Sequence, residues 1–68
     1  MPDLWGTPKA VIVKAAIRKY SDAVAVSVQP LSTGLWAYVD YRRNDGALVH
    51  DAPVYGRDII HEDWTHAS

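Results

Sequence analysis

The first hydrophobic pattern along the chain has the period of an amphipathic helix. Apolar side chains recur at steps of three and four positions, and Lys14 and Arg18 lie together on the opposite side. The apolar positions are Ile12, Val13, Ala16, Ile17 and Tyr20. Thr7 followed by Pro8 is typical of a helix start, because threonine caps free N–H groups and proline suits the first helical position. We therefore predict a helix of about 13 residues that ends near positions 21–22.

The period then changes from 3.6 to 2, which is typical of strands. Val24, Val26 and Val28 alternate with smaller or polar residues, and this alternation predicts a first strand with one buried face. Proline and glycine in the segment 30–34 predict a loop, because proline cannot donate to a strand ladder. A second strand is expected over residues 35–42.

Side chains of the second predicted strand alternate between two faces. One face carries Leu35, Ala37, Val39 and Tyr41, and the other carries Trp36, Tyr38, Asp40 and Arg42. The sequence Asn-Asp-Gly at 44–46 favours a tight hairpin turn, because the Asp-Gly pair tolerates a positive φ. A third strand should then run from 47 to about 51, and Pro53 should end it.

The last part of the chain fits two structures. Asp58 would cap a short helix that carries Ile60 and Trp64, or residues 57–60 would form a fourth strand. We favour the helix. Because each element has one face that must leave water, we expect a single small α+β domain over residues 1–68. In this domain the N-terminal helix packs on the valine face of a three-stranded antiparallel meander.

The order helix–strand–strand–strand–helix is similar to that of the double-stranded-RNA-binding domain. In that family the second helix is basic at its start and contacts phosphates. The corresponding stretch in this chain, residues 58–63, is acidic. The chain is therefore not assigned to that family.

Composition excludes several classes of protein. With 68 residues, 49% of them hydrophobic and 22% charged, the chain fits one ordinary globular domain. The absence of cysteine excludes disulfides, thiolate zinc sites and cysteine nucleophiles. The longest apolar runs, at 10–13 and 23–26, are far shorter than the roughly 20 residues of a membrane span. Because the start also lacks the pattern of a secretory signal, we expect a cytoplasmic protein that contacts no membrane.

Charge is distributed unevenly along the chain. Residues 1–43 carry six Lys and Arg against three Asp, whereas residues 44–68 carry one Arg against five Asp and Glu. Such a separation either steers a partner or orients two copies, or the two groups of charges neutralise one another within the fold.

The strongest candidate for a functional surface is the face that carries Trp36 and Tyr38. Tryptophan, tyrosine and arginine dominate binding hot spots, because they bury large areas and keep a polar group for a hydrogen bond. The alternative is that Trp5, Tyr55 or Trp64 folds over this face and completes a second small core. On the first interpretation, the residues that contact a larger protein are Trp36, Tyr38, Arg42, Lys14 and Arg18.

Small domains without an active site often bind and block a larger protein, as phage-encoded inhibitors do. By this analogy we expect a non-enzymatic inhibitor or adaptor. One alternative is a nucleic-acid-binding protein whose aromatic side chains stack on bases. That protein would use Trp36, Tyr38, Lys14, Arg18, Lys19, Arg42 and Arg43, although the net charge of −1 is less positive than such a role favours. Another alternative is a structural homodimer, paired through the aromatic face or through an exposed edge strand.

Chemistry-bearing motifs are sparse. His61 and His66 are five positions apart, so they diverge on a helix instead of sharing a zinc-binding face, and His50 stands apart from both. The serines at positions 21, 27 and 32 lack the glycine-flanked turn of a hydrolase nucleophile. The glycines at 34, 46 and 56 are isolated and form no phosphate-binding loop. We therefore expect no metal, no cofactor and no enzymatic activity.

Overall fold

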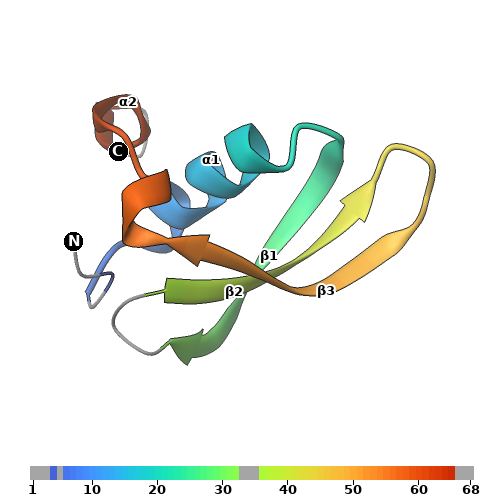
Figure 1. Cartoon of the computed structure of the whole chain (residues 1–68), viewed down its shortest axis with the longest axis horizontal. Coiled ribbons are helices and arrows are strands. Elements are labelled where there is room, and N and C mark those ends of the chain that lie inside the picture. The colour runs from blue at the N-terminus through green and yellow to red at the C-terminus, as the bar shows by residue number, and fades with distance from the viewer. Residues whose placement is uncertain (1–3, 5, 33–35, 66–68) are drawn as a thin grey trace.

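The computed structural model describes residues 4, 6–32 and 36–65. Its elements are α1 (Lys9–Lys19), β1 (Ala23–Ser32), β2 (Trp36–Arg43), β3 (Leu48–Tyr55), the 3-10 helix η1 (Gly56–Asp58) and α2 (His61–Thr65). The strands form an antiparallel sheet in the order β1-β2-β3, and α1 lies across one of its faces (Figure 1). This arrangement confirms the predicted α+β fold.

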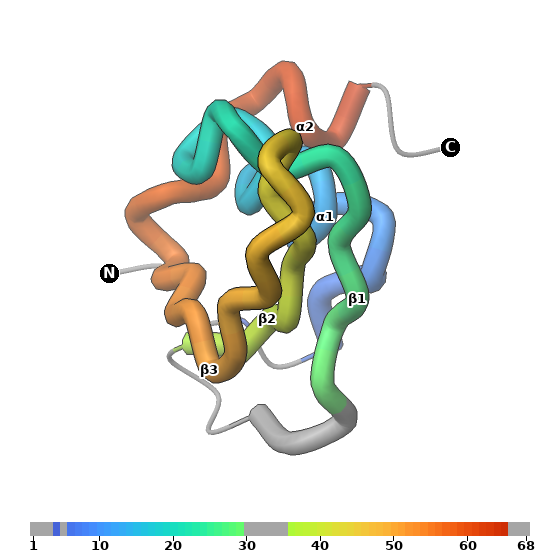
Figure 2. The backbone as a smooth tube through the Cα atoms, turned by 90° about the vertical axis from the view of Figure 1, so that its right-hand side faces the viewer, coloured from blue at the N-terminus to red at the C-terminus, as the bar shows by residue number. Residues whose placement is uncertain are grey.

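The core lies between α1 and the sheet. Its buried members are Leu4, Ile12, Ala15, Ala16, Ala37, Val39, Ala52 and Val54. The alternation predicted for β2 is confirmed, since Ala37 and Val39 are fully covered. Small side chains at Ala15 and Ala16 let the helix backbone approach the sheet closely, and Figure 2 shows the two layers one above the other.

The buried face of α1 differs from the predicted one. Val11 and Ala15 are fully buried, whereas Val13 is half-buried and Ile17 is 45% exposed. Between 10 and 17 the sequence has apolar residues at every position except Lys14, so the periodicity does not fix the rotation of the helix.

The start and end of α1 also need correction. Pro8 is the N-cap residue itself, with φ −59° and ψ 144°, and no side chain caps the helix, so Thr7 does not have the predicted role. The helix has 11 residues, and the Tyr20 N–H donates to the Ala16 carbonyl at 2.8 Å where it ends. The Tyr20 ring then stacks on Tyr41 of β2, with centroids 4.9 Å apart.

Two prolines that were expected to stop strands lie inside them instead. β1 continues through Pro30 to Ser32, and β3 continues through Pro53 to Tyr55. Both are edge strands. On an edge strand, every second residue points its backbone N–H away from the sheet, so a proline there removes no hydrogen bond to β2. In β1 the register also shifts between Val28 and Ser32, which accommodates the irregular stretch.

The hairpin between β2 and β3 forms as predicted. The Gly46 N–H donates to the Arg43 carbonyl at 2.9 Å, and the Arg43 N–H donates to Ala47 at 2.8 Å. Gly46 has a φ of 90°, which glycine adopts without steric strain. The Asp45 carboxylate accepts from the Ala47 N–H at 2.9 Å and closes the turn.

The C-terminal part forms the short helix that we favoured, and the sheet of the described residues has three strands. Asp58 caps η1 and not α2, because its carboxylate accepts from the Tyr55 N–H at 2.8 Å. In α2 the Asp63 carboxylate accepts from the Ile60 N–H at 2.8 Å. Across the described ranges, neither α-helix has the length and apolar content that crossing a membrane requires.

Candidate functional site

The candidate site is the sheet face that points away from α1, which we call the outer face. It carries Ala25, Ser27 and Gln29 of β1, Trp36, Tyr38, Asp40 and Arg42 of β2, and Leu48, His50, Pro53 and Tyr55 of β3. Their strand neighbours Val26, Tyr41 and Val49 pack against the core on the other side. In Figure 1, α1 and α2 both lie on that other side, so neither of them covers the outer face.

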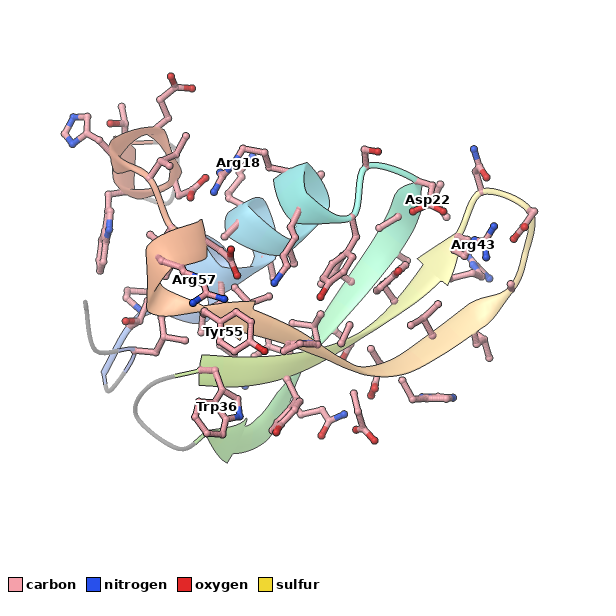
Figure 3. All side chains as sticks on the ribbon, in the orientation of Figure 1. Arg18, Asp22, Trp36, Arg43, Tyr55 and Arg57 are labelled. Atoms are coloured by element: carbon pink, nitrogen blue, oxygen red, sulfur yellow. The ribbon has the colours of Figure 1, made fainter. Side chains whose placement is uncertain are left out.

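Three aromatic side chains meet at one end of the outer face: Trp36, Tyr38 and Tyr55, which we call the aromatic end. Trp36 and Tyr55 are register partners, with ring centroids 6.4 Å apart and planes at 68°. Trp36 and Tyr38 have centroids 6.5 Å apart and planes at 87°. Both contacts are the favourable edge-to-face kind, and Figure 3 shows Trp36 and Tyr55 next to each other.

The aromatic end is half-buried, and Tyr55 does not fold over it as a lid. Tyr55 of β3 lies beside Trp36 of β2. Trp36 itself packs against the core. Trp64 lies on α2 and is 50% exposed, and Trp5 falls outside the described residues.

Two cations lie against the ring of Tyr55. The Lys19 Nζ atom is 4.6 Å from the ring centroid, and the Arg57 Cζ atom is 4.7 Å from it. Cations at this distance are attracted to the electron-rich ring face. Lys19 also pairs with Asp58, with Nζ and Oδ2 2.9 Å apart. The rim of the aromatic end is therefore positively charged and anchored to both α1 and η1.

Beside the aromatic end, Gln29, Asp40 and Asp51 form a hydrogen-bonded polar centre. Gln29 Nε2 donates to Asp40 Oδ1 at 2.9 Å and to Asp51 Oδ1 at 2.6 Å. The Asp51 N–H also donates to Asp40 Oδ1 at 3.1 Å. These bonds, first that from Gln29 and then that from the Asp51 N–H, lower the pKa of Asp40 below its ordinary value. Asp40 is therefore ionised at neutral pH.

A one-residue bulge in β3 sets the geometry of the polar centre. Val39 pairs with Ala52 and Tyr41 pairs with Val49, so β3 has one residue more than β2 over this stretch. Asp51 lies in the bulge with a φ of 59°, a left-handed conformation that aspartate tolerates better than most residues. The bulge aims the Asp51 N–H at the carboxylate of Asp40.

The other end of the outer face contains a hollow of about 290 Å³. Val26, Tyr41 and Val49 line it from below, and their side chains pack against the core on the other side of the sheet. Its walls are two rows of outer-face side chains: Ala25, Arg42 and Leu48 on one side, and Ser27, Asp40 and His50 on the other. The volume is at the lower limit for small-molecule sites, so the hollow suits a single large side chain.

The predicted binding residues fall on two separate surfaces. Trp36, Tyr38 and Arg42 share the outer face, whereas Lys14 and Arg18 lie on α1, on the opposite side of the sheet. Arg42 is exposed and forms no ion pair with any described residue. It is thus the cation of the outer face that is available to a partner.

The remaining predicted cations are used within the fold. Arg43 pairs with Asp22 at 3.0 Å and with Asp45 at 3.1 Å, at the hairpin end of the sheet (Figure 3). Arg18 pairs with Asp63 at 2.6 Å, and Lys19 pairs with Asp58 as described above. Cations of the basic half therefore neutralise acids of the acidic half, which is one of the two outcomes that the uneven charge distribution allowed.

Sequence reasoning missed Leu48 as a member of the outer face, and it considered Tyr55 only as a residue that folds over this face. Tyr55 was missed because Pro53 was expected to end the strand before it. Leu48 is 67% exposed and is the register partner of Arg42. The sequence signal for this position was a single leucine directly after the hairpin turn. The alternation along β1 placed Gln29 beside Trp36 and Tyr38, but its hydrogen bond to Asp51 depends on the bulge and could not be predicted.

Within the described ranges, no three His, Cys, Asp or Glu side chains lie close enough together to hold a metal ion. His66 falls outside those ranges. No family model matches the chain, and neither the curated proteins nor the solved structures contain a match.

Proposed function

We propose that this chain is a non-enzymatic, cytoplasmic interaction module that binds a larger protein through its outer face. The observation that supports this proposal is the pair of features on that face, an aromatic end and a hollow, which neither described α-helix covers. Tryptophan, tyrosine and arginine, which dominate binding hot spots, all lie on this face. An inhibitor or adaptor role, of the kind that phage accessory proteins perform, is part of the proposal.

Charge placement favours a protein partner over a nucleic acid. A nucleic-acid interface needs cations alongside the stacking side chains. Here Lys14 and Arg18 lie on the helix side, away from Trp36 and Tyr38. Lys19 and Arg57 do lie beside the Tyr55 ring, but the carboxylate of Asp58 next to them offsets part of their charge. The outer face itself carries the carboxylate of Asp40 at its centre, which repels phosphates.

Site-specific photo-cross-linking tests the proposal. A photoreactive amino acid replaces Leu48, which is exposed on the outer face, or Lys14, which is exposed on α1. Each protein is irradiated in nuclease-treated lysate of its source or host cell, and the products are analysed by mass spectrometry. We expect the probe at position 48 to cross-link to one protein. The probe at position 14 shows whether that protein also contacts α1.

Two variants decide whether the cross-link reports a specific interface. Tyr38→Ala and Arg42→Glu should abolish the product from position 48, and the exposed cation Lys9, changed to Glu on α1, should leave it intact. Circular dichroism checks that all three variants are folded. A product that needs intact nucleic acid, or that survives both outer-face substitutions, would overturn the proposal.

A further inference from the structure

The two edges of the sheet are poorly suited to pairing with another strand. β1 contains Pro30 and a register shift between Val28 and Ser32, and β3 contains Pro53 and the bulge at Asp51. Prolines and bulges on edge strands remove donors and twist the edge away from a partner strand. The outer face of the sheet is therefore a more suitable surface for association than either edge.

The outer face is complementary to itself along β2. From one end to the other, its side chains on this strand are Trp36, Tyr38, Asp40 and Arg42, two aromatics followed by an anion and a cation. The positions 36 and 42 are equally far from Val39, as are 38 and 40. A copy placed antiparallel on this face thus sets each aromatic side chain against a charged one.

We propose that a second copy of this chain packs antiparallel on the outer face, with Trp36 of each copy against Arg42 of the other. The two-fold axis lies in the plane between the two faces and crosses β2 at right angles at the level of Val39. Each contact therefore occurs twice. Arg42 then gains an aromatic ring as its partner, a cation–π contact that it lacks within the described residues of one copy.

Two further contacts follow from the same axis. Tyr38 meets Asp40, whose Oδ2 atom accepts no hydrogen bond from the described residues because the three contacts to this carboxylate use Oδ1. The Tyr38 hydroxyl can donate to that oxygen. On β3, Tyr55 is the register partner of Trp36, and Leu48 is the register partner of Arg42. The contact between Trp36 and Arg42 therefore also brings the exposed Leu48 of each copy onto the Tyr55 ring of the other.

The alternative two-fold arrangement is unfavourable. An axis parallel to β2 would place Arg42 on Arg42 and Asp40 on Asp40 of the other copy. Opposed like charges destabilise an interface, so the antiparallel arrangement is preferred. The antiparallel arrangement also brings the aromatic end of each copy over the end of the face that contains the hollow.

The small area of the face limits the affinity. Three strands at about 4.8 Å spacing and seven residues at about 3.3 Å each give roughly 300 Å² per copy in projection. A standard stable interface buries about 800 Å² per partner. We therefore expect a reversible dimer with a dissociation constant of about 10⁻⁵ to 10⁻³ M, which a larger partner with higher affinity displaces.

Analytical ultracentrifugation of the purified chain between about 10 µM and 1 mM tests the dimer directly. We expect a monomer–dimer equilibrium that Arg42→Glu weakens at least about tenfold, because the new carboxylate replaces the cation opposite Trp36. Lys9→Glu changes the net charge by the same amount on α1 and should leave the equilibrium unchanged. A monomer throughout this range, or equal effects of the two variants, would overturn the proposal.

Cross-linking of cysteine variants tests the antiparallel orientation. The chain has no cysteine, so Leu48→Cys and Tyr55→Cys each introduce the only thiol. Across the antiparallel interface, positions 48 and 55 are separated by about 10 Å, whereas each is over 20 Å from its own copy. A short bis-maleimide should join the two variants when they are mixed and neither of them alone. Cross-linking of either variant with itself would contradict the arrangement.

The dimer rests on the proposed function only in that it uses the same face. Its tests use purified protein, so a monomeric result leaves capture of a larger protein from lysate untouched. Conversely, a dimer without a captured partner would overturn the proposed function and support the structural homodimer.

Discussion

Arg18 on α1 and Asp63 on α2 form an ion pair, with Nη1 and Oδ1 2.6 Å apart. The two residues are 45 positions apart in sequence, and Asp63 is 4% exposed. Arg18 also donates to the Asp58 carbonyl, and Asp63 accepts from the Ile60 N–H. A helix of five residues is unstable by itself, so these contacts hold α2 against α1.

Asp63→Ala should lower the free energy of unfolding by about 1–3 kcal/mol, because it removes a charged hydrogen bond and the bond to the Ile60 N–H. Urea denaturation followed by circular dichroism measures the change. Glu62→Ala alters an exposed acid in the same turn of α2 and should change the free energy by less than about 0.5 kcal/mol. Equal effects of the two substitutions would show that α2 does not depend on this pair.

Acid should weaken the fold through Asp58 and Asp63. Burial alone would raise the pKa of both carboxyls, but hydrogen bonds from Lys19 and Arg18 hold each pKa below its ordinary value of 3.8. Carboxyls with a lowered pKa stabilise the folded state fully above about pH 5, and this contribution is lost as pH falls through the lowered values. Unfolding free energies measured from pH 6 to 2.5 should therefore fall steeply below pH 4.

The double variant Asp58→Asn with Asp63→Asn isolates this effect. Its free energy of unfolding should be lower than that of the wild type at pH 6 and should fall less towards pH 2.5. Some acid sensitivity should remain, because hydrogen bonds from Gln29 and the Asp51 N–H also lower the pKa of Asp40. If the variant and the wild type lose the same free energy, the two carboxyls do not cause the acid sensitivity.

Local patterns predicted the elements of this fold but not the tertiary contacts between them. The Asn-Asp-Gly turn and the short C-terminal helix depend on neighbouring residues, and both are present. The valine alternation holds in part, since Val26 and Val28 pack against the core whereas Val24, at a register shift in β1, is 60% exposed. The two strands that contain Pro30 and Pro53 were cut short, because whether a strand is an edge is decided by sheet order, which a local pattern does not contain.

Only part of the candidate site could be predicted, again because a local pattern does not contain tertiary contacts. Alternation along one strand was enough to group Trp36, Tyr38 and Arg42. It could not show that Lys14 lies on the opposite side of the sheet, because that depends on which face α1 covers. Tyr55 joins the site through the register between β2 and β3, which the bulge at Asp51 shifts by one residue.

The rotation of α1 can be tested with two isoleucines that the sequence pattern treats alike. Ile12 is 5% exposed and Ile17 is 45% exposed. Ile12→Ala should lower the free energy of unfolding by about 2–5 kcal/mol, because it leaves a cavity in the core. Ile17→Ala should cost at most about 1 kcal/mol, because its site is open to water. Urea denaturation that gave the opposite order would place the predicted face, and not the observed one, against the sheet.

Substitutions at Asp51 should reveal the strained backbone of the bulge. Its φ of 59° is costly for a residue with a Cβ atom and free of steric cost for glycine. Asp51→Gly and Asp51→Ala both lose the hydrogen bond from Gln29, so their difference in stability reports the backbone in the folded and unfolded states and not this bond. Asp51→Ala should be less stable than Asp51→Gly by about 1 kcal/mol in urea denaturation, even though alanine is the less flexible residue when unfolded. If alanine were equally or more stable, Asp51 would not adopt the left-handed conformation, and the N–H would not be aimed at Asp40.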